Sequence, residues 1–78
     1  MKYVGVLYLN EESKIYTGRQ YTYMTNLPLQ NLDRVICPVG NKGELKRACV
    51  IDDNVPVELI PENIIPILKS ITRYDEGE

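Results

Sequence analysis

From residue 33 to residue 52 the sequence reads DRVICPVGNKGELKRACVID, and this segment constrains the architecture more than any other. Its two apolar runs, 33–39 and 44–52, flank the tetrapeptide Gly40-Asn41-Lys42-Gly43. Gly and Asn tolerate the positive φ that tight hairpin turns require, so the pattern predicts two antiparallel strands joined there. Pro38 has no amide donor and therefore marks a strand end or a sheet edge.

Strand-like runs also precede this hairpin. Residues 3–9 are rich in Tyr, Val and Leu and stop at the turn-forming segment 10–13. Residues 19–25 alternate, which places Tyr21 and Tyr23 on one face of a strand. Shorter strands are expected at residues 14–17, ended by Gly18, and at residues 57–60.

A helix is expected after the last strand. Asn63 can cap it, and Pro66 falls in its first turn, where a missing amide costs little. Apolar side chains at helical spacing form one stripe, which consists of Ile64, Ile67, Leu68 and Ile71. We therefore predict a short C-terminal helix that covers one end of the sheet.

Short strands joined by tight turns and followed by one helix predict a mainly β protein. The expected fold is a small five-stranded, partly open barrel of the SH3-like or OB-like type with a short C-terminal helix. At 78 residues the chain has room for one domain, whose core is thin. We assign residues 1–72 to this domain and residues 73–78 to a frayed acidic tail.

The charge of the chain is unevenly distributed. The formal net charge is −2, yet residues 1–47 carry seven Lys or Arg and four Asp or Glu, whereas residues 48–78 carry two and seven. Such an asymmetry can mark an interaction surface, or it can arise from the ordinary patchiness of a small protein.

Histidine is absent from the sequence, which removes the commonest general base and the commonest metal ligand. Two cysteines cannot supply the four ligands of a zinc site, and the serines at positions 13 and 70 have no base nearby in the sequence. The sequence therefore predicts no catalytic residue, no metal site and no cofactor, in a protein that is not an enzyme.

Both cysteines lie inside apolar runs. A hairpin turning at Asn41-Lys42 places Cys37 opposite Lys46. By the same register Cys49 lies opposite Arg34, so the two sulfurs are too far out of register for a disulfide. Buried reduced thiols are typical of a reducing compartment, so we expect a cytoplasmic protein. No run has the length of a membrane span, and we expect no membrane contact.

All six aromatic residues are tyrosines. Tyr buries a ring while its polar tip stays in water, which suits interfaces. Arg19 precedes Tyr21 and Tyr23 in the same register, so one strand face reads Arg-Tyr-Tyr. Three interpretations stay open: the rings close a small barrel that has no Phe, they form a protein-binding patch, or they stack on nucleic-acid bases.

Basic residues could also form a nucleic-acid-binding surface. This surface would use the strand that carries Arg19 and, in addition, Arg34, Lys46 and Arg47. Lys46 and Arg47 are neighbours on one expected strand and should point to opposite faces, which weakens a continuous stripe. The sequence pI of about 5.1 argues against phosphate binding as the main task.

Part of the chain resembles a known pattern of small barrels. Its residues are Tyr21-Thr22-Tyr23, the run from Leu32 to Gly40, and the run from Ala48 to Ile51. In that pattern a tyrosine-bearing strand is followed by Gly-Asp-x-Val-x-Val-Pro, a glycine turn and a strand of small residues. The segment 19–52 is similar to the N-terminal DNA 3′-end-binding domain of the primosomal helicase family, and to short proteins of Gram-positive bacteria and their phages. The resemblance implies the fold and a phage or mobile-element origin; Leu32 stands where the pattern has glycine.

The main hypothesis from the sequence is a small non-enzymatic binding module that contacts a protein partner, as an adaptor or an inhibitor. Its expected contact residues are Arg19, Tyr21, Tyr23, Asn41 and Lys42. The alternative is a nucleic-acid-binding accessory domain. Because the edge strands of so small a barrel can pair between chains, we expect a monomer or a small homo-oligomer.

Overall fold

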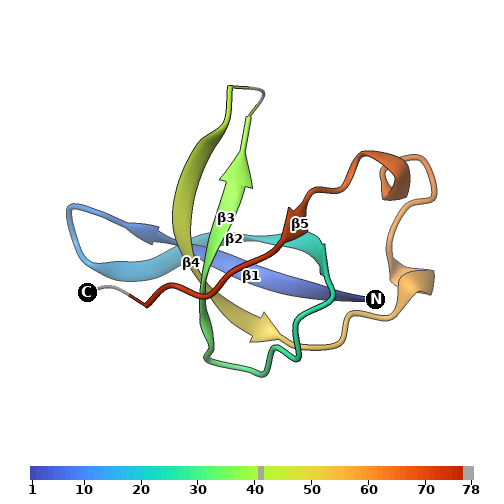
Figure 1. Ribbon diagram of the computed structural model, residues 1–78, viewed down its shortest axis with the longest axis horizontal. Helices are drawn as coiled ribbons and strands as arrows, with labels where there is room; N and C mark the ends of the chain where they lie inside the picture. Colours follow the sequence, from blue (N-terminus) through green and yellow to red (C-terminus); the bar gives the residue numbers. More distant parts are fainter. Residues whose placement is uncertain (41, 77–78) are drawn as a thin grey trace.

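The computed structural model describes residues 1–40 and 42–76. Over these residues the chain is mainly β, with five strands and two 3-10 helices of three residues each. One sheet holds these strands in the order β3-β4-β1-β2-β5 (Figure 1). The elements are β1 (Lys2–Asn10), β2 (Ile15–Thr25), β3 (Arg34–Val39), β4 (Glu44–Asp52), η1 (Val57–Leu59), η2 (Ile65–Ile67) and β5 (Ser70–Ile71).

The β3–β4 hairpin has the register that its turn sequence predicts. Cys37 pairs with Lys46, and Cys49 lies three positions further along β4. Gly40 and Gly43 flank the turn with φ values of 67° and 76°, a left-handed region that glycine enters without steric cost. Both thiols are free and buried, as the sequence predicts.

β1 and β2 form a long hairpin with one irregularity. The turn begins at Asn10, whose side-chain Oδ1 accepts hydrogen bonds from the amides of Glu12 (2.9 Å) and Ser13 (3.1 Å). Gly18 does not end a strand, contrary to the prediction, because β2 runs through it with a φ of 101°. The pairing register shifts nearby, as at a β-bulge, which bends the hairpin and increases its twist.

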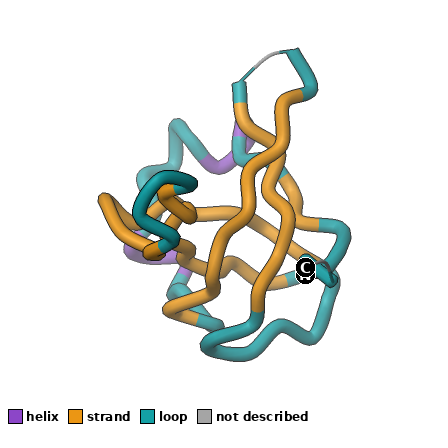
Figure 2. The backbone as a smooth tube through the Cα atoms, turned by 90° about the vertical axis from the view of Figure 1, so that its left-hand side faces the viewer, coloured by secondary structure: helices purple, strands orange, loops and turns teal. Residues whose placement is uncertain are grey.

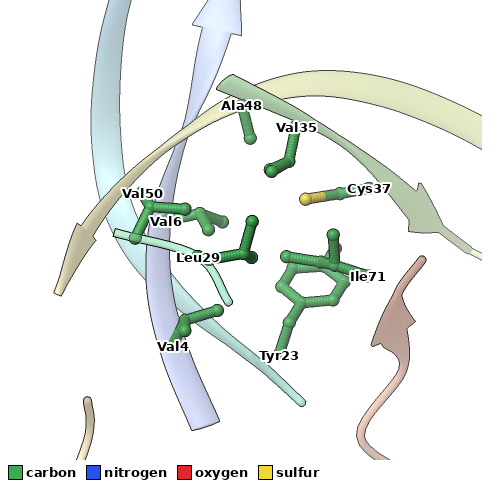
Figure 3. Close-up of a cluster of buried hydrophobic side chains, with 9 residues drawn as sticks. All are labelled: Val4, Val6, Tyr23, Leu29, Val35, Cys37, Ala48, Val50 and Ile71. Carbon is green, nitrogen blue, oxygen red and sulfur yellow. The ribbon is translucent and has the colours of Figure 1, made fainter. Parts of the chain in front are cut away.

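The hydrophobic core lies on one face of the sheet, whose strands curve around it (Figures 2 and 3). Alternate residues of each strand supply it, such as Val4 and Val6 of β1 and Val35 and Cys37 of β3, which are fully buried. Burying a side chain such as Val contributes about 1.5–3 kcal/mol, so a few of them stabilise so small a sheet. The cluster consists of Val4, Val6, Tyr23, Leu29, Val35, Cys37, Ala48, Val50 and Ile71.

The sheet is not closed into a barrel over the described residues. The segment 73–75 instead runs beside β3. The amide of Ile36 donates to the carbonyl of Arg73 at 3.3 Å, and the amide of Asp75 donates to the carbonyl of Arg34 at 2.9 Å. The prediction of a mainly β protein is therefore confirmed, whereas the prediction of a tail frayed from Arg73 onward is wrong as far as Asp75.

The predicted C-terminal helix at residues 64–71 is wrong. η2 is one 3-10 turn, and Ser70–Ile71 form β5, which pairs in parallel with Met24 and Thr25 of β2. Ile71 reaches the core from this strand. No helix in the part of the chain that the structure describes has the length and apolarity needed to cross a membrane.

The short strand predicted at residues 57–60 is also wrong, because η1 occupies most of this segment. Pro56 and Pro61 lie on either side of this segment and supply no amide donors, which disfavours a strand there.

Candidate functional site

The core face of the sheet continues beyond the core into solvent. On β1 its residues are Val4 and Val6, which are buried, and then Tyr8, which is half-buried. On β2 the same face carries Tyr23, which is 5% exposed, and then Tyr21, which is 38% exposed. Because side chains on one face of a strand are two residues apart, the tyrosine pair follows directly from the core. The core thus ends in an accessible aromatic surface.

Two of these tyrosines form a stacked pair. The rings of Tyr8 and Tyr21 have centroids 4.5 Å apart and planes inclined by 19°. Stacked aromatic pairs contribute about 0.5–1.5 kcal/mol beyond the area they bury, so stacking favours this arrangement of the two rings.

A chain of hydrogen bonds connects Tyr8, one member of the pair, to β3. The hydroxyl of Tyr23 donates to the carbonyl of Pro38 at 2.9 Å, and the hydroxyls of Tyr8 and Tyr23 lie 2.5 Å apart. Since a phenol has one proton to donate, Tyr8 is the donor to Tyr23 in this chain. The bonds therefore run from β1 through β2 to β3 and hold the Tyr8 ring in the position where Tyr21 stacks on it.

Both hydroxyls in this chain stay protonated at neutral pH. Burial is the main cause that raises the pKa of Tyr23 above its ordinary value, and the bond with Tyr8 adds to it. Burial also raises the pKa of Tyr8, against a smaller lowering by its bond with Tyr23. These two hydroxyls consequently add no negative charge to the surface at neutral pH.

Two cations flank the aromatic pair. The guanidinium carbon of Arg19 lies 5.7 Å from the centroid of the Tyr21 ring, and Nζ of Lys46 lies 5.1 Å from that of the Tyr8 ring. A cation over a tyrosine face is attracted by the ring quadrupole, by about 0.5–1 kcal/mol at exposed sites. We call the four residues Arg19, Tyr21, Tyr8 and Lys46 the aromatic–basic cluster.

A groove of about 430 Å³ lies beside this cluster. One wall is β2 from Arg19 to Tyr23 together with Tyr8, and the opposite wall is the end of β3 and the glycine that follows it. The segment before β5 closes one end with Ile64, Ile67, Leu68 and Lys69. The groove thus lies between the two sides of the curved sheet where they do not pair.

The predicted contact residues are only partly brought together. Arg19, Tyr21 and Tyr23 share one face, as the alternation predicts, but Tyr23 is a core residue whose hydroxyl is already bonded. Lys42 is exposed and does not line the groove. Asn41 lies outside the described residues. Arg19 and Tyr21 are therefore the predicted residues that are both exposed and part of the groove wall.

The predicted nucleic-acid-binding residues are divided between the two faces of the sheet. Lys46 lies over the Tyr8 ring on the core face. Arg34 and Arg47 line a second groove of about 540 Å³ on the outer face, so Lys46 and Arg47 do point to opposite faces. Arg34 lies 5.7 Å from the ring centroid of Tyr16 in this second groove.

The acidic tail enters the second groove. Nε of Arg47 lies 3.5 Å from Oδ2 of Asp75, whose side chain is almost fully buried, and Glu76 also lines the groove. The basic residues of the outer face are thus already close to carboxylates of the same chain.

Sequence reasoning missed Tyr8 and Lys69. The alternation of Val4, Val6 and Tyr8 in the first strand could have identified Tyr8, because it places the Tyr8 ring on the core face. Lys69 carried no such signal, because it precedes a two-residue strand that no sequence pattern marks.

Burial favours the protonated form of both thiols. Burial raises the pKa of Cys37 to about 12. Burial also raises the pKa of Cys49, against a lowering by Arg34. Within residues 1–40 and 42–76, no group of three or more His, Cys, Asp or Glu side chains is placed to hold a metal ion.

Comparison with protein-family models, with curated proteins and with solved structures found no match for this chain. What the groove can bind therefore follows from its own side chains.

Proposed function

We propose that this protein is a non-enzymatic binding module that takes a segment of a protein partner in the groove beside the aromatic–basic cluster. The observation that carries the proposal is the stacked pair of Tyr8 and Tyr21, which is partly exposed and flanked by Arg19 and Lys46. Tyr and Arg are the residue types most enriched among the side chains that dominate protein interfaces. The module would act as an adaptor or as an inhibitor of its partner.

The dimensions of the groove favour a segment of chain over a flat protein surface. The groove is open, of about 430 Å³, and is walled by strand backbone on one side and by apolar side chains at its end. An extended segment can place one side chain on the Tyr21 ring while its backbone lies along the groove. A pre-formed, rigid surface loses little conformational entropy on binding, which favours affinity.

The proposal is tested by selecting peptides from a random displayed library on the immobilised full chain. We expect the selected peptides to lose affinity by about tenfold or more on Tyr21→Ala, since an anchor tyrosine of this kind is worth more than about 1.4 kcal/mol. Tyr74→Ala is the matched control, because Tyr74 is 37% exposed, nearly as much as Tyr21, and does not line the groove. Selected peptides that bind the two variants equally well would refute the proposal.

Nucleic-acid binding is a second candidate, and one observation favours it. Lys14, Arg34 and Arg47 line the outer groove with Tyr16, a combination of cations and a ring suited to phosphates and bases. Asp75 and Glu76 in the same groove oppose it. The test is the fluorescence anisotropy of a labelled single-stranded oligonucleotide at increasing salt. Binding that weakens steeply with salt and with Arg34→Ala would support this candidate, and no binding at low salt would remove it.

A further inference from the structure

The edge of β2 that faces the groove has backbone groups available for pairing. On its other edge β2 pairs with β1 along nearly its whole length. On the groove side β5 pairs with it only at Met24 and Thr25. Among the residues that the structure describes, no strand pairs with this edge from Ile15 to Tyr23. An unpaired strand edge is a template for another extended chain.

The direction of the amides identifies Thr22 as the next donor on this edge. The amide of Met24 donates to the carbonyl of Lys69 at 3.1 Å, so it points toward the groove side. Amides two residues apart along a strand point to the same side, and Thr22 lines the groove. A chain that continued the line of β5 along β2 would meet the N–H and C=O of Thr22 first.

The opposite wall of the groove cannot serve in the same way. On β3 the amide of Ile36 and the carbonyl of Arg34 face the tail, so Pro38 is the next residue to face this side. Pro38 has no amide, and its carbonyl already accepts the hydroxyl of Tyr23. Strand addition is therefore possible along β2 and is blocked at Pro38.

The charge around the groove favours an acidic occupant. Arg19 and Lys69 line it, and Lys46 lies just beyond on the Tyr8 ring. No Asp or Glu lines the groove within the described part of the chain, although the whole chain has a net charge of −2. Cations around a groove on an otherwise acidic protein attract acidic segments by electrostatic complementarity.

We infer that the partner segment is an acidic extended chain that adds to β2 as a new strand at Thr22 and places an apolar or aromatic side chain on the Tyr8–Tyr21 pair. This inference rests on the proposed function and specifies the class of partner. Backbone hydrogen bonds to β2 give affinity in this arrangement, and the aromatic–basic cluster selects the side chains.

The probe for the charge preference is a short capped peptide in which Glu alternates with Val and Tyr, and its matched control has Lys in place of each Glu. Each is titrated into the ¹⁵N-labelled full chain and followed by NMR. We expect the acidic peptide to shift the amides of β2 and to slow hydrogen exchange at the Thr22 amide. We also expect its affinity to fall as salt rises and to fall by about tenfold on Arg19→Glu. Equal binding of the two peptides, or no binding of the acidic one at millimolar concentration, overturns the charge preference.

The probe for strand addition is Thr22→Pro, with Thr22→Ala as its control. Thr22→Pro removes the donor on the groove side without removing a bond to β1, so we expect the variant to fold and to lose the peptide, whereas Thr22→Ala keeps it. Should Thr22→Pro melt early, the exchange rate of the Thr22 amide in the wild-type complex decides, because an added strand must slow it. An unchanged exchange rate in the complex overturns strand addition.

Two other outcomes are informative. A dimer of the chain alone that Thr22→Pro dissociates would make a second copy the occupant and would overturn the inference. Library peptides that depend on Tyr21 but not on the Thr22 amide would leave the proposed function standing and remove only strand addition.

Discussion

The amide of Leu32 donates a 2.7 Å hydrogen bond to the carbonyl of Val50 while Leu32 itself has a φ of 77°. This bond ties the loop before β3 to β4. The left-handed conformation costs a residue with a Cβ about 1–2 kcal/mol, whereas glycine adopts it without strain.

Leu32→Gly should therefore stabilise the protein. The Leu32 side chain is 76% exposed, so little packing is lost. Relief of the strain outweighs the greater entropy of glycine in the unfolded chain, and we expect a gain of roughly 0.5–1 kcal/mol in the free energy of unfolding. Urea denaturation measures it. Leu32→Ala is the control, because it keeps the strain and should change stability little; equal effects of the two substitutions would contradict this account.

Tyr23→Phe should cost more stability than Tyr8→Phe. The first substitution leaves both the carbonyl of Pro38 and the hydroxyl of Tyr8 without their partner. The second leaves the bond from Tyr23 to Pro38 in place. A buried group that loses its hydrogen-bond partner costs about 1–3 kcal/mol. The loss of stability in Tyr23→Phe should therefore lie toward the upper end of this range, and that in Tyr8→Phe near the lower end. Thermal melting of both variants gives the order, and the reverse order would show that the chain of bonds runs otherwise.

Stability should fall at alkaline pH, in part through Cys37. Burial raises the pKa of this thiol from an ordinary value of 9.0 to about 12. Between these pH values the unfolded chain releases a proton that the native protein retains, so the free energy of unfolding decreases as pH rises. One such group contributes a slope of about 1.4 kcal/mol per pH unit. Above about pH 10 the raised pKa values of Tyr8 and Tyr23 act in the same direction.

Urea midpoints measured from neutral pH to about pH 11 test this dependence. Cys37→Ala should lower stability at neutral pH, because it leaves a small cavity in the core, and should flatten the alkaline slope. The slope should not vanish, because burial also raises the pKa of Cys49. An unaltered slope in Cys37→Ala would contradict the assignment.

Gly5→Ala should destabilise the protein through one side chain. A Cβ at Gly5 would lie 2.0 Å from Nε2 and 2.6 Å from Cδ of Gln20, which crosses the glycine from the neighbouring strand. The end of Gln20 is flexible and can move, so the expected cost is only about 1 kcal/mol. In a Gln20→Ala background the same substitution should be neutral or stabilising. The reason is that Gly in a strand interior loses more conformational entropy on folding than Ala does. A double-mutant cycle measures the coupling, and additive effects would refute the contact.

The pairing of individual residues between β3 and β4 could be predicted because two local signals agree there. The turn fixes its register, and the alternation of Val35 and Cys37 fixes its face. For the same reason, the shared face of Arg19, Tyr21 and Tyr23 could be predicted. The sequence could not predict which of these residues remains accessible. The buried position of Tyr23 depends on Pro38 and Ile71, which are far away in the sequence.

The C-terminal third was mispredicted because long-range pairing overrides its local pattern. Ile64, Ile67, Leu68 and Ile71 have helical spacing, yet only Ile71 becomes buried, through two backbone pairs with β2. The attachment of the tail to β3 likewise rests on single hydrogen bonds to residues some forty positions earlier in the chain. Such contacts leave no periodic trace in a sequence, and the groove that they delimit was therefore not predictable.

The parallel pairing of β5 also orders events during biosynthesis. Ile71 is 1% exposed, and Thr25 is joined to it by a 2.9 Å hydrogen bond across 46 residues of chain. The four longer strands are translated before Ile71, so a nascent chain on the ribosome lacks one core side chain and one end of the groove. The core and this end of the groove are therefore complete only once translation has passed this strand.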